Sequence, residues 1–305
     1  MLKFTLRQLE YAVTVADCGT VAAAAHLLGV AQPSISAALK NLENQVGMQL
    51  FVRRTAKGVV PSPQGARFLS EARSLMSHAR ELERASTGLT DSVAGELRIG
   101  CFHTLAPVYI PRLISSFSKR HPGVVMRLEE GDEGRLFDGL RGGRLDLALI
   151  YRVADAPDIQ MADVATLTPH VILPAGHALA KRKTVDLRDL ANEPFISLNI
   201  EPSRTYFNRL LLAAGVTPKI TTETSSIELL RAMVGHGMGY SVLITRPVGD
   251  RSYDGKRLAV RDIGGEVECG IVSLATLKTM RPTHLVATFI SFATQFISST
   301  SRSEA

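Results

Sequence analysis

Apolar side chains in the first sixty residues recur every three or four positions, which predicts amphipathic helices rather than strands. The predicted helices cover residues 4–16, 21–28 and 32–46. Thr20 stands where an N-cap is expected, and Gly29 and Gly47 stand where helices commonly end. Only residues 29–31 separate the second helix from the third. A turn this short predicts a helix-turn-helix, in which the second helix fits the major groove of DNA.

The third predicted helix carries small and polar side chains on the face opposite its apolar stripe. These residues are Pro33, Ser36, Ala37, Lys40 and Asn44, and Gln32 lies at the N-terminal tip of the helix. A Gln side chain can pair bidentately with adenine and a Ser can serve several bases, whereas Lys40 is better suited to phosphate. Taken alone, this face has a second interpretation, namely the solvated surface of an ordinary three-helix bundle.

A short hairpin is predicted directly after the third helix. Residues 50–52 have the pattern of a strand, residues 53–58 form a basic turn, and Val59 and Val60 begin the return strand. Arg53 and Arg54 are then placed to enter a narrow minor groove, where the negative potential is enhanced. A solvated loop is the alternative for an Arg-Arg pair, but the position after a recognition helix favours a DNA-binding wing.

Beyond Pro63, apolar positions recur in alternating steps of four and three, which is a heptad seam. The seam consists of Phe68, Ala72, Leu75, Ala79, Leu82, Ser86 and Leu89. We expect a linker helix over residues 63–92 that pairs with a second copy, because a helix isolated between two domains needs a partner for its apolar stripe. The alternative is a helix that packs on its own domain.

From residue 93, strand patterns alternate with helix patterns. Near-continuous apolar runs such as residues 145–151 indicate a parallel sheet covered on both faces. A second unit of the same kind starts near residue 168, and the chain returns to the first unit near residue 268. We therefore predict an α/β fold with an N-terminal all-α winged helix-turn-helix at residues 1–62. Residues 93–305 form a hinged clamp of two subdomains, about 93–167 with 268–305, and about 168–267.

Candidate ligand-binding residues lie where strands of the clamp end, since open α/β folds bind ligands beyond the carboxyl ends of their strands. They are His103, Thr104, Asp132, Tyr151, Arg152, Ser197 and Ser203. His103 is the sharpest candidate because an imidazole can donate to a carboxylate, although a buried structural histidine is the alternative. Thr104 and Ser203 can equally be plain helix caps. Asp132 favours an effector that also carries an amine or another donor.

The charge of the chain agrees with a polyanionic partner. The formal net charge is +6 and the pI is about 9.4, and the first 62 residues hold six Lys or Arg against three acidic residues. The three cysteines are far apart and have no metal-ligand or disulfide spacing, the N-terminus lacks the pattern of an export signal, and no apolar run is long enough for a membrane span. We expect a cytoplasmic protein with no cofactor and no metal.

An enzyme is the rival class, together with a ligand-binding α/β protein that has an incidental DNA-binding-like N-terminus. The chain contains no G-x-S-x-G, no G-x-x-x-x-G-K-[ST] and no H-E-x-x-H sequence. The glycines around His236 follow a helix and precede a strand, the reverse of a dinucleotide loop. A purely architectural DNA-binding protein would not need the large clamp. We expect no catalytic activity.

The stretch from Gly19 to Gly65 resembles the DNA-binding domain of LysR-type transcriptional regulators. The match includes Gln32-Pro33-Ser34, Ser36, Leu42-Glu43, Gly47, Leu50-Phe51, Arg53 and Pro63 to Gly65, and the length and domain order of the whole chain agree. The resemblance implies base contacts from Gln32, Pro33 and Ser36 and a wing contact from Arg53. We also expect Ser34, within the same motif, to bind DNA. Ala37 departs from the Arg or Gln common at that position in the family.

The resemblance also implies partners and a mode of action. Members of the family use the linker helix to form dimers, usually assemble into tetramers, and carry a periplasmic-binding-protein-like sensor that often binds small organic acids. We therefore expect double-stranded DNA, a small-molecule effector and further copies of this chain as partners. In our hypothesis, effector-dependent closure of the clamp shifts the linker helices and thereby changes the DNA bend and the contact with RNA polymerase.

Overall fold

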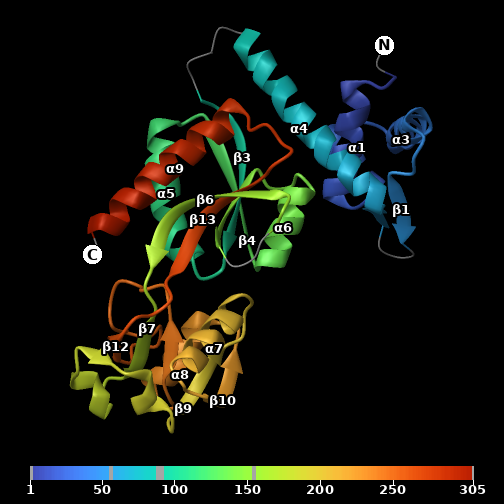
Figure 1. Cartoon of the computed structure of the whole chain (residues 1–305). Helices are drawn as coiled ribbons and strands as arrows, with labels where there is room; N and C mark the ends of the chain where they lie inside the picture. Colours follow the sequence, from blue (N-terminus) through green and yellow to red (C-terminus); the bar gives the residue numbers. More distant parts are fainter. Residues whose placement is uncertain (1–2, 55–57, 87–92, 153–155, 304–305) are drawn as a thin grey trace.

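A computed structural model describes residues 3–54, 58–86, 93–152 and 156–303. The chain forms a small N-terminal unit, a long helix beside it, and two α/β units placed end to end (Figure 1). The long helix runs past the N-terminal unit and the upper α/β unit and connects them along the chain.

The N-terminal unit has the three predicted helices and the predicted hairpin. Its elements are α1 (Leu6–Cys18), α2 (Val21–Leu28), α3 (Gln32–Val46), β1 (Phe51–Arg54) and β2 (Gly58–Pro61). Thr20 caps α2 by accepting a hydrogen bond from the backbone N–H of Ala23 at 3.1 Å. The axes of α2 and α3 turn by 112°, within the usual range for a helix-turn-helix. Ile35, Leu39 and Leu42 face the core of this unit as predicted.

The hairpin differs from the prediction in one respect. Arg53 and Arg54 were expected in the turn, but both belong to β1, where they pair with Val59 and Gly58. The backbone of the hairpin packs closely against the turn between α1 and α2. Val59 donates to the carbonyl oxygen of Gly19 at 2.8 Å, and a Cβ at position 58 would lie only 2.3 Å from that oxygen. Gly58, with φ of 79°, is therefore required for this close approach.

The linker helix α4 (Pro63–Ser86) begins at Pro63 as expected. Its first half belongs to the N-terminal core, because Ala72 is buried there and Phe68 packs against the same cluster. The predicted heptad seam therefore has two parts, of which the first packs within the N-terminal unit. Leu75 and Leu82 remain exposed and available to a partner, whereas Leu89 lies outside the described residues.

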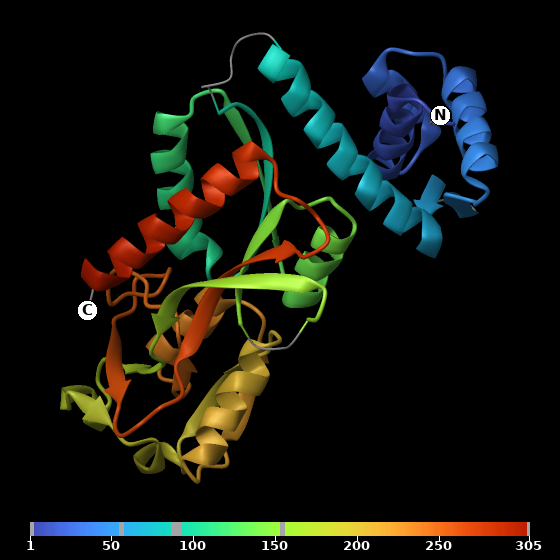
Figure 2. The ribbon, with the colours of Figure 1, turned by 45° about the horizontal axis from the view of Figure 1, so that its top comes forward.

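The upper α/β unit contains a five-stranded sheet in the order β4-β3-β5-β13-β6. Its elements are β3 (Gly95–Phe102), α5 (Ala106–Arg120), β4 (Val124–Gly131), α6 (Glu133–Arg141), β5 (Leu147–Tyr151), β6 (Ile159–Leu167), β13 (Gly270–Leu277) and α9 (His284–Ser303). Helices α5 and α9 lie side by side on one face and α6 covers the other (Figure 1, Figure 2). The predicted parallel pairing is confirmed for β4, β3 and β5, whereas β13 runs antiparallel to both β5 and β6, so the sheet is mixed.

The lower α/β unit has two strand groups that meet at one bridge between Phe195 and Tyr240. Its elements are β7 (His170–Pro174), η1 (Ala178–Lys181), β8 (Thr184–Val185), η2 (Leu187–Leu190), β9 (Pro194–Leu198), α7 (Ser203–Ala213), β10 (Lys219–Thr224), α8 (Ile227–Gly235), β11 (Ser241–Leu243) and β12 (Leu258–Ile263). The chain passes between the units twice, from β6 to β7 and from β12 to β13. These two crossings form the hinge.

None of the described helices, taken singly, is both long enough and apolar enough to cross a membrane. The bent pair α2 and α3 meets the criteria of length and composition when joined, but these two helices are the helix-turn-helix.

Candidate functional site

The side chains of the predicted recognition face of α3 are exposed to solvent. Gln32, Pro33, Ser34, Ser36 and Lys40 are all exposed. None of them belongs to the buried stripe of Ile35, Leu39 and Leu42. This arrangement leaves their side chains available to base edges and phosphates in a groove. Arg53 on β1 is also exposed, whereas the side chain of Arg54 and the turn with Lys57 lie outside what the structure describes.

Glu43 fixes the wing relative to the recognition helix, a role that sequence reasoning did not assign. Its Oε1 atom accepts hydrogen bonds from the backbone N–H groups of Leu50 at 2.7 Å and Phe51 at 3.2 Å. One carboxylate on α3 therefore holds the start of β1. The available signal was a Glu that directly follows Leu42, the last buried residue of the apolar stripe of α3.

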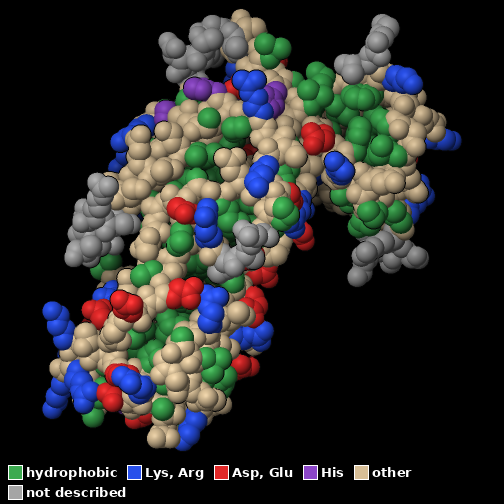
Figure 3. Space-filling model, in the orientation of Figure 1, with side chains coloured by type: hydrophobic (Ala, Val, Ile, Leu, Met, Phe, Trp, Pro, Cys, Tyr) green, Lys and Arg blue, Asp and Glu red, His purple; other side chains and the backbone are tan. Residues whose placement is uncertain are grey.

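Two of the three acidic side chains of the N-terminal unit are engaged in contacts within the protein. Glu43 binds the wing backbone, and Asp17 forms an ion pair with Arg73 of α4 at 2.6 Å. Figure 3 shows Lys and Arg side chains along the outer edge of this unit, while most acidic side chains in that view lie over the α/β units. Lys and Arg therefore outnumber the acidic side chains that this unit has left for its surface, which favours a polyanionic partner.

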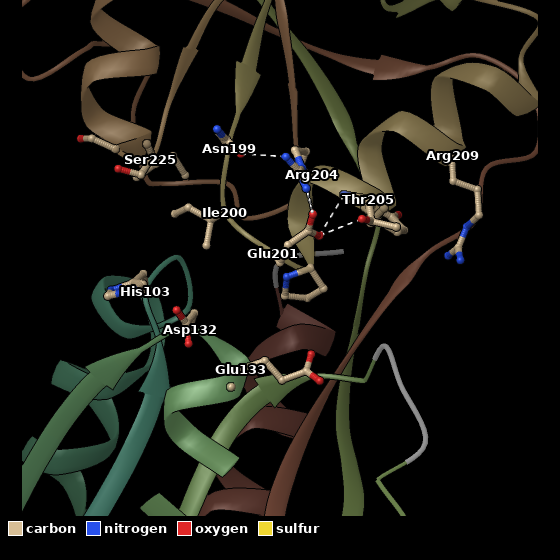
Figure 4. Close-up of a pocket in the computed structure, with 15 residues that line it drawn as sticks. His103, Asp132, Glu133, Asn199, Ile200, Glu201, Arg204, Thr205, Arg209 and Ser225 are labelled. Carbon is tan, nitrogen blue, oxygen red and sulfur yellow. Dashed lines mark hydrogen bonds and ion pairs between the residues drawn. The ribbon is translucent and has the colours of Figure 1, made fainter. Parts of the chain in front are cut away.

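A cleft of about 1040 Å³ opens between the two α/β units. In Figure 4 the upper unit is drawn at the bottom. His103, Asp132 and Glu133 of that unit face Asn199, Glu201 and Arg204 of the lower unit. His103 and Asp132, two of the residues predicted to bind the effector, therefore line the same cleft. Asp132 caps α6 by accepting from the backbone N–H of Arg135 at 2.8 Å, and its remaining oxygen can face a ligand.

The two arginines of the cleft are already paired. Arg204 lies 2.6 Å from Glu201, and Arg209 lies 2.6 Å from Glu268 on the hinge crossing. Burial alone would raise the pKa of Glu201, but hydrogen bonds from Thr205 and Arg204 bring it below its usual value. Both ion pairs are about half exposed, so each is weak and can exchange for a ligand carboxylate.

The upper side of the cleft has carboxylates in excess. Burial, and then the charge of the neighbouring Asp132, raise the pKa of Glu133. A positively charged ligand group placed between these two carboxylates would relieve that repulsion. His103 lies on the same side of the cleft, with its Nδ1 atom 3.9 Å from a carboxylate oxygen of Glu130 and its side chain exposed.

Three other predicted residues line a smaller cavity of about 220 Å³ beside the hinge. They are Tyr151, Arg152 and Ser203. Arg152 forms an ion pair with Asp163 at 3.0 Å. The two cavities share Pro202, Tyr206 and Arg209, and the Tyr206 hydroxyl donates to the backbone carbonyl of Glu268. Tyr206 and Arg209 therefore stand between the open cleft and its inner recess.

Two predicted residues do not line either space. Thr104 does not cap α5, whose N-cap is Leu105 with no side-chain hydrogen bond. Its hydroxyl is buried and lies 3.0 Å from the Tyr151 hydroxyl, so it positions Tyr151 instead. Ser197 is buried within β9, where it pairs with Glu223 of β10.

Among the residues described, no group of three or more His, Cys, Asp or Glu side chains is arranged to hold a metal ion. The described cysteines Cys18, Cys101 and Cys269 are all free thiols. Burial, with a smaller contribution from Glu130, raises the pKa of the Cys101 thiol.

Known protein families match both the N-terminal and the C-terminal part of the chain. The family described as bacterial regulatory helix-turn-helix protein, lysR family, matches residues 6–66. The family described as LysR substrate binding domain matches residues 90–297. Curated relatives include the transcriptional regulator CfxR of Cupriavidus necator, which is 31% identical over 265 residues, 86% of this chain and 82% of that protein.

Solved structures give the same result over nearly the full length. HinK, a LysR family transcriptional regulator from Pseudomonas aeruginosa, is 40% identical, with a TM-score of 0.67 and coverage of 97% of this chain and 99% of that one. A full-length OxyR variant from the same organism is 26% identical, with a TM-score of 0.77 and coverage of 97% and 98%. The chain therefore belongs to the LysR family of DNA-binding transcriptional regulators, which carry an effector-binding domain and are not enzymes.

Proposed function

We propose that this protein reads operator DNA with Gln32, Pro33, Ser34 and Ser36 and anchors itself with Lys40, Arg53 and Arg54. The observation that carries the proposal is the exposed polar face of α3 beside a wing that Glu43 holds in register. Small and polar side chains on an exposed recognition helix suit base edges, whereas the basic side chains suit phosphates and a narrow minor groove.

The chain acts as a homodimer or homotetramer in the bacterial cytoplasm. Leu75 and Leu82 of α4 are 45% and 72% exposed, which supports a second copy of α4 as their partner. A two-fold dimer places two recognition helices about one helical turn of DNA apart, or a multiple of it. Effector-dependent closure then alters the spacing of the linker helices and the contact with RNA polymerase.

The effector is a small organic acid that also carries a protonated amine or another strong donor. The acid group exchanges with Glu201 or Glu268 on the cleft arginines, and the donor lies between Asp132 and Glu133. A ligand with only negative charge would meet an excess of carboxylates on the upper side. His103, Tyr151, Arg152 and Ser203 complete the site from the cleft and its recess.

A gel-shift and footprint on the DNA upstream of the gene for this protein tests the DNA-binding proposal, with salt and competitor DNA controlled. We expect a footprint of two half-sites that survives excess random DNA. Binding no tighter than to random DNA, both there and in a genome-wide binding selection, would contradict it.

The effector proposal is tested by calorimetry of the full-length protein with three glutarate-sized probes, namely glutamate, glutarate and 4-aminobutyrate. We expect glutamate to bind more tightly than glutarate, and His103→Ala to weaken that binding while leaving DNA affinity intact. A preference for glutarate would contradict the need for a donor.

A further inference from the structure

Ala37 lies at the centre of the exposed face of α3 but is absent from the DNA contacts proposed above. A rotation of about 100° per residue places it about 160° around the helix from both Ile35 and Leu39, which are buried. Pro33, one turn earlier, is also exposed and is a neighbour of Ala37 on the helix surface. The centre of this face is therefore a strip of two small apolar side chains, with polar side chains such as Ser36 beside it.

Ala37 belongs to the part of α3 that can reach base edges. A recognition helix contacts bases with its N-terminal residues, and Ala37 is about 7.5 Å along the helix from Gln32. Farther along, Glu43 accepts from the wing backbone, and Gln45 accepts a hydrogen bond from Nε2 of Gln8 on α1 at 3.3 Å. Two side chains in the C-terminal third of α3 thus hold the unit together, whereas the face around Ala37 is open to a groove.

The side chain of an alanine can read only one feature of the major groove. It is a single methyl group without a donor or an acceptor, so it cannot select the nitrogen and oxygen atoms of a base edge. Thymine is the one base whose edge carries an apolar group, the C5 methyl. Because the side chain of Ala37 is short, the helix backbone can approach the bases closely there, and the ring of Pro33 adds apolar surface beside it.

We propose that Ala37 determines operator specificity by packing its Cβ atom against the C5 methyl of one thymine in each half-site. The inference rests on the proposed DNA-binding function and adds a required base at a position that no hydrogen bond from this side chain selects. Burial of one methyl group contributes about 0.8 kcal/mol, which corresponds to about fourfold in affinity. A dimer that reads two half-sites multiplies this preference.

Removing the thymine methyl from the DNA tests the proposal without changing base pairing. A selection from random duplexes with the full-length protein first defines the operator. Each thymine is then replaced by deoxyuridine in both half-sites at once, and affinity is measured by fluorescence anisotropy. We expect a loss of about fourfold per half-site at one symmetric position. When cytosine is placed at that position, a 5-methyl group on it should restore part of the affinity.

Two variants connect that methyl to Ala37. Ala37→Gly removes the side chain and Ala37→Gln replaces it with a longer polar one, so the thymine and deoxyuridine operators should bind almost equally to each variant. Asn44→Ala is the matched control, because Asn44 is exposed on the same face about 10 Å farther along the helix, and it should keep the wild-type ratio. Thermal unfolding checks that each variant is folded, and Ala37→Gln decides the matter if the glycine variant is unstable.

The possible results separate this inference from the proposed function. Failure to select any operator would contradict sequence-specific DNA binding altogether, and the role of Ala37 with it. A selected operator in which no deoxyuridine weakens binding would overturn only the thymine contact. A deoxyuridine effect that persists in both Ala37 variants would overturn the role of Ala37 and assign the methyl contact to another side chain, such as Pro33.

Discussion

Arg73 of the linker helix donates from Nη2 to Asp17 of α1 at 2.6 Å, and the same guanidinium donates from Nη1 to the backbone carbonyl of Gly142 at 2.6 Å. Asp17 belongs to the DNA-binding unit and Gly142 ends α6 of the effector domain. Arg73 is only 7% exposed. One buried side chain therefore connects all three parts of the protein.

Replacing Arg73 with Ala should destabilise the contact between the DNA-binding unit and the effector domain. Removing one partner of a buried pair commonly costs 3–5 kcal/mol. Asp17 is 41% exposed and can be hydrated, so we expect a loss of about 2 kcal/mol in the free energy of unfolding. Urea unfolding followed by circular dichroism measures this loss.

Arg67→Ala is the matched control for Arg73→Ala, because Arg67 lies on the same helix and is exposed. It should change stability by less than about 0.5 kcal/mol. Limited proteolysis should also cut between the units faster in Arg73→Ala than in Arg67→Ala. Equal stability and equal proteolysis of the two variants would show that Arg73 does not couple the domains.

Ser36→Ala and Lys40→Ala should separate base reading from phosphate binding on α3. Ser36→Ala should weaken binding to the operator by about 1–3 kcal/mol and leave affinity for random DNA nearly unchanged. Lys40→Ala should weaken both and lower the slope of log affinity against log salt by about 1. Fluorescence anisotropy over a salt series measures both quantities. Equal losses on operator and random DNA from Ser36→Ala would remove it from the base-reading set.

The N-terminal unit was predictable because its information is local. The spacing of Ile35, Leu39 and Leu42 and the residues Thr20 and Gly29 act within one or two helical turns, and the structure has them as expected. What could not be predicted depends on distant contacts. The Arg73–Asp17 pair spans 56 positions and the Thr104–Tyr151 hydrogen bond spans 47.

The strand directions in the upper sheet and the composition of the ligand cleft also depend on contacts between residues that are distant in the sequence. The sequence pattern of residues 270–277 indicates a buried strand, but nothing local states that β13 runs antiparallel to β5. The search for polar residues at strand ends selected His103 and Asp132, which line the cleft. The same search missed Glu201, Arg204 and Arg209, because these residues reach the cleft only through the packing of one unit against the other.

Leu82→Glu should weaken self-association through α4. Leu82 is 72% exposed, so a charge there should hardly affect folding of a single chain, but it would be buried without a partner at a paired seam. We expect at least a tenfold weaker dimer in light scattering and analytical ultracentrifugation. Leu27→Glu is the control, since Leu27 of α2 is 70% exposed and lies outside the seam. Unchanged mass distributions for Leu82→Glu would move the dimer interface away from this part of α4.

His170 should make the lower α/β unit sensitive to acid. Neither ring nitrogen has a hydrogen-bond partner among the described residues, and burial is the main reason that its pKa is lowered to about 3. The unfolded chain, with a histidine pKa near 6.5, binds the proton more readily than the folded chain. The stabilising contribution is therefore complete above about pH 6.5 and is lost as pH falls from 6.5 towards 3, by about 2 kcal/mol at pH 5.

His170→Phe should remove this part of the pH dependence while keeping a ring at the position. The variant should lose about 2 kcal/mol less stability than the wild type between pH 7 and pH 5. It should also be at least as stable at pH 7, because two unpaired buried nitrogens are replaced by carbon. Urea unfolding at the two pH values measures both effects. His26→Phe, at an exposed position, should keep the wild-type dependence, and the same loss in all three proteins would mean that another group controls acid unfolding.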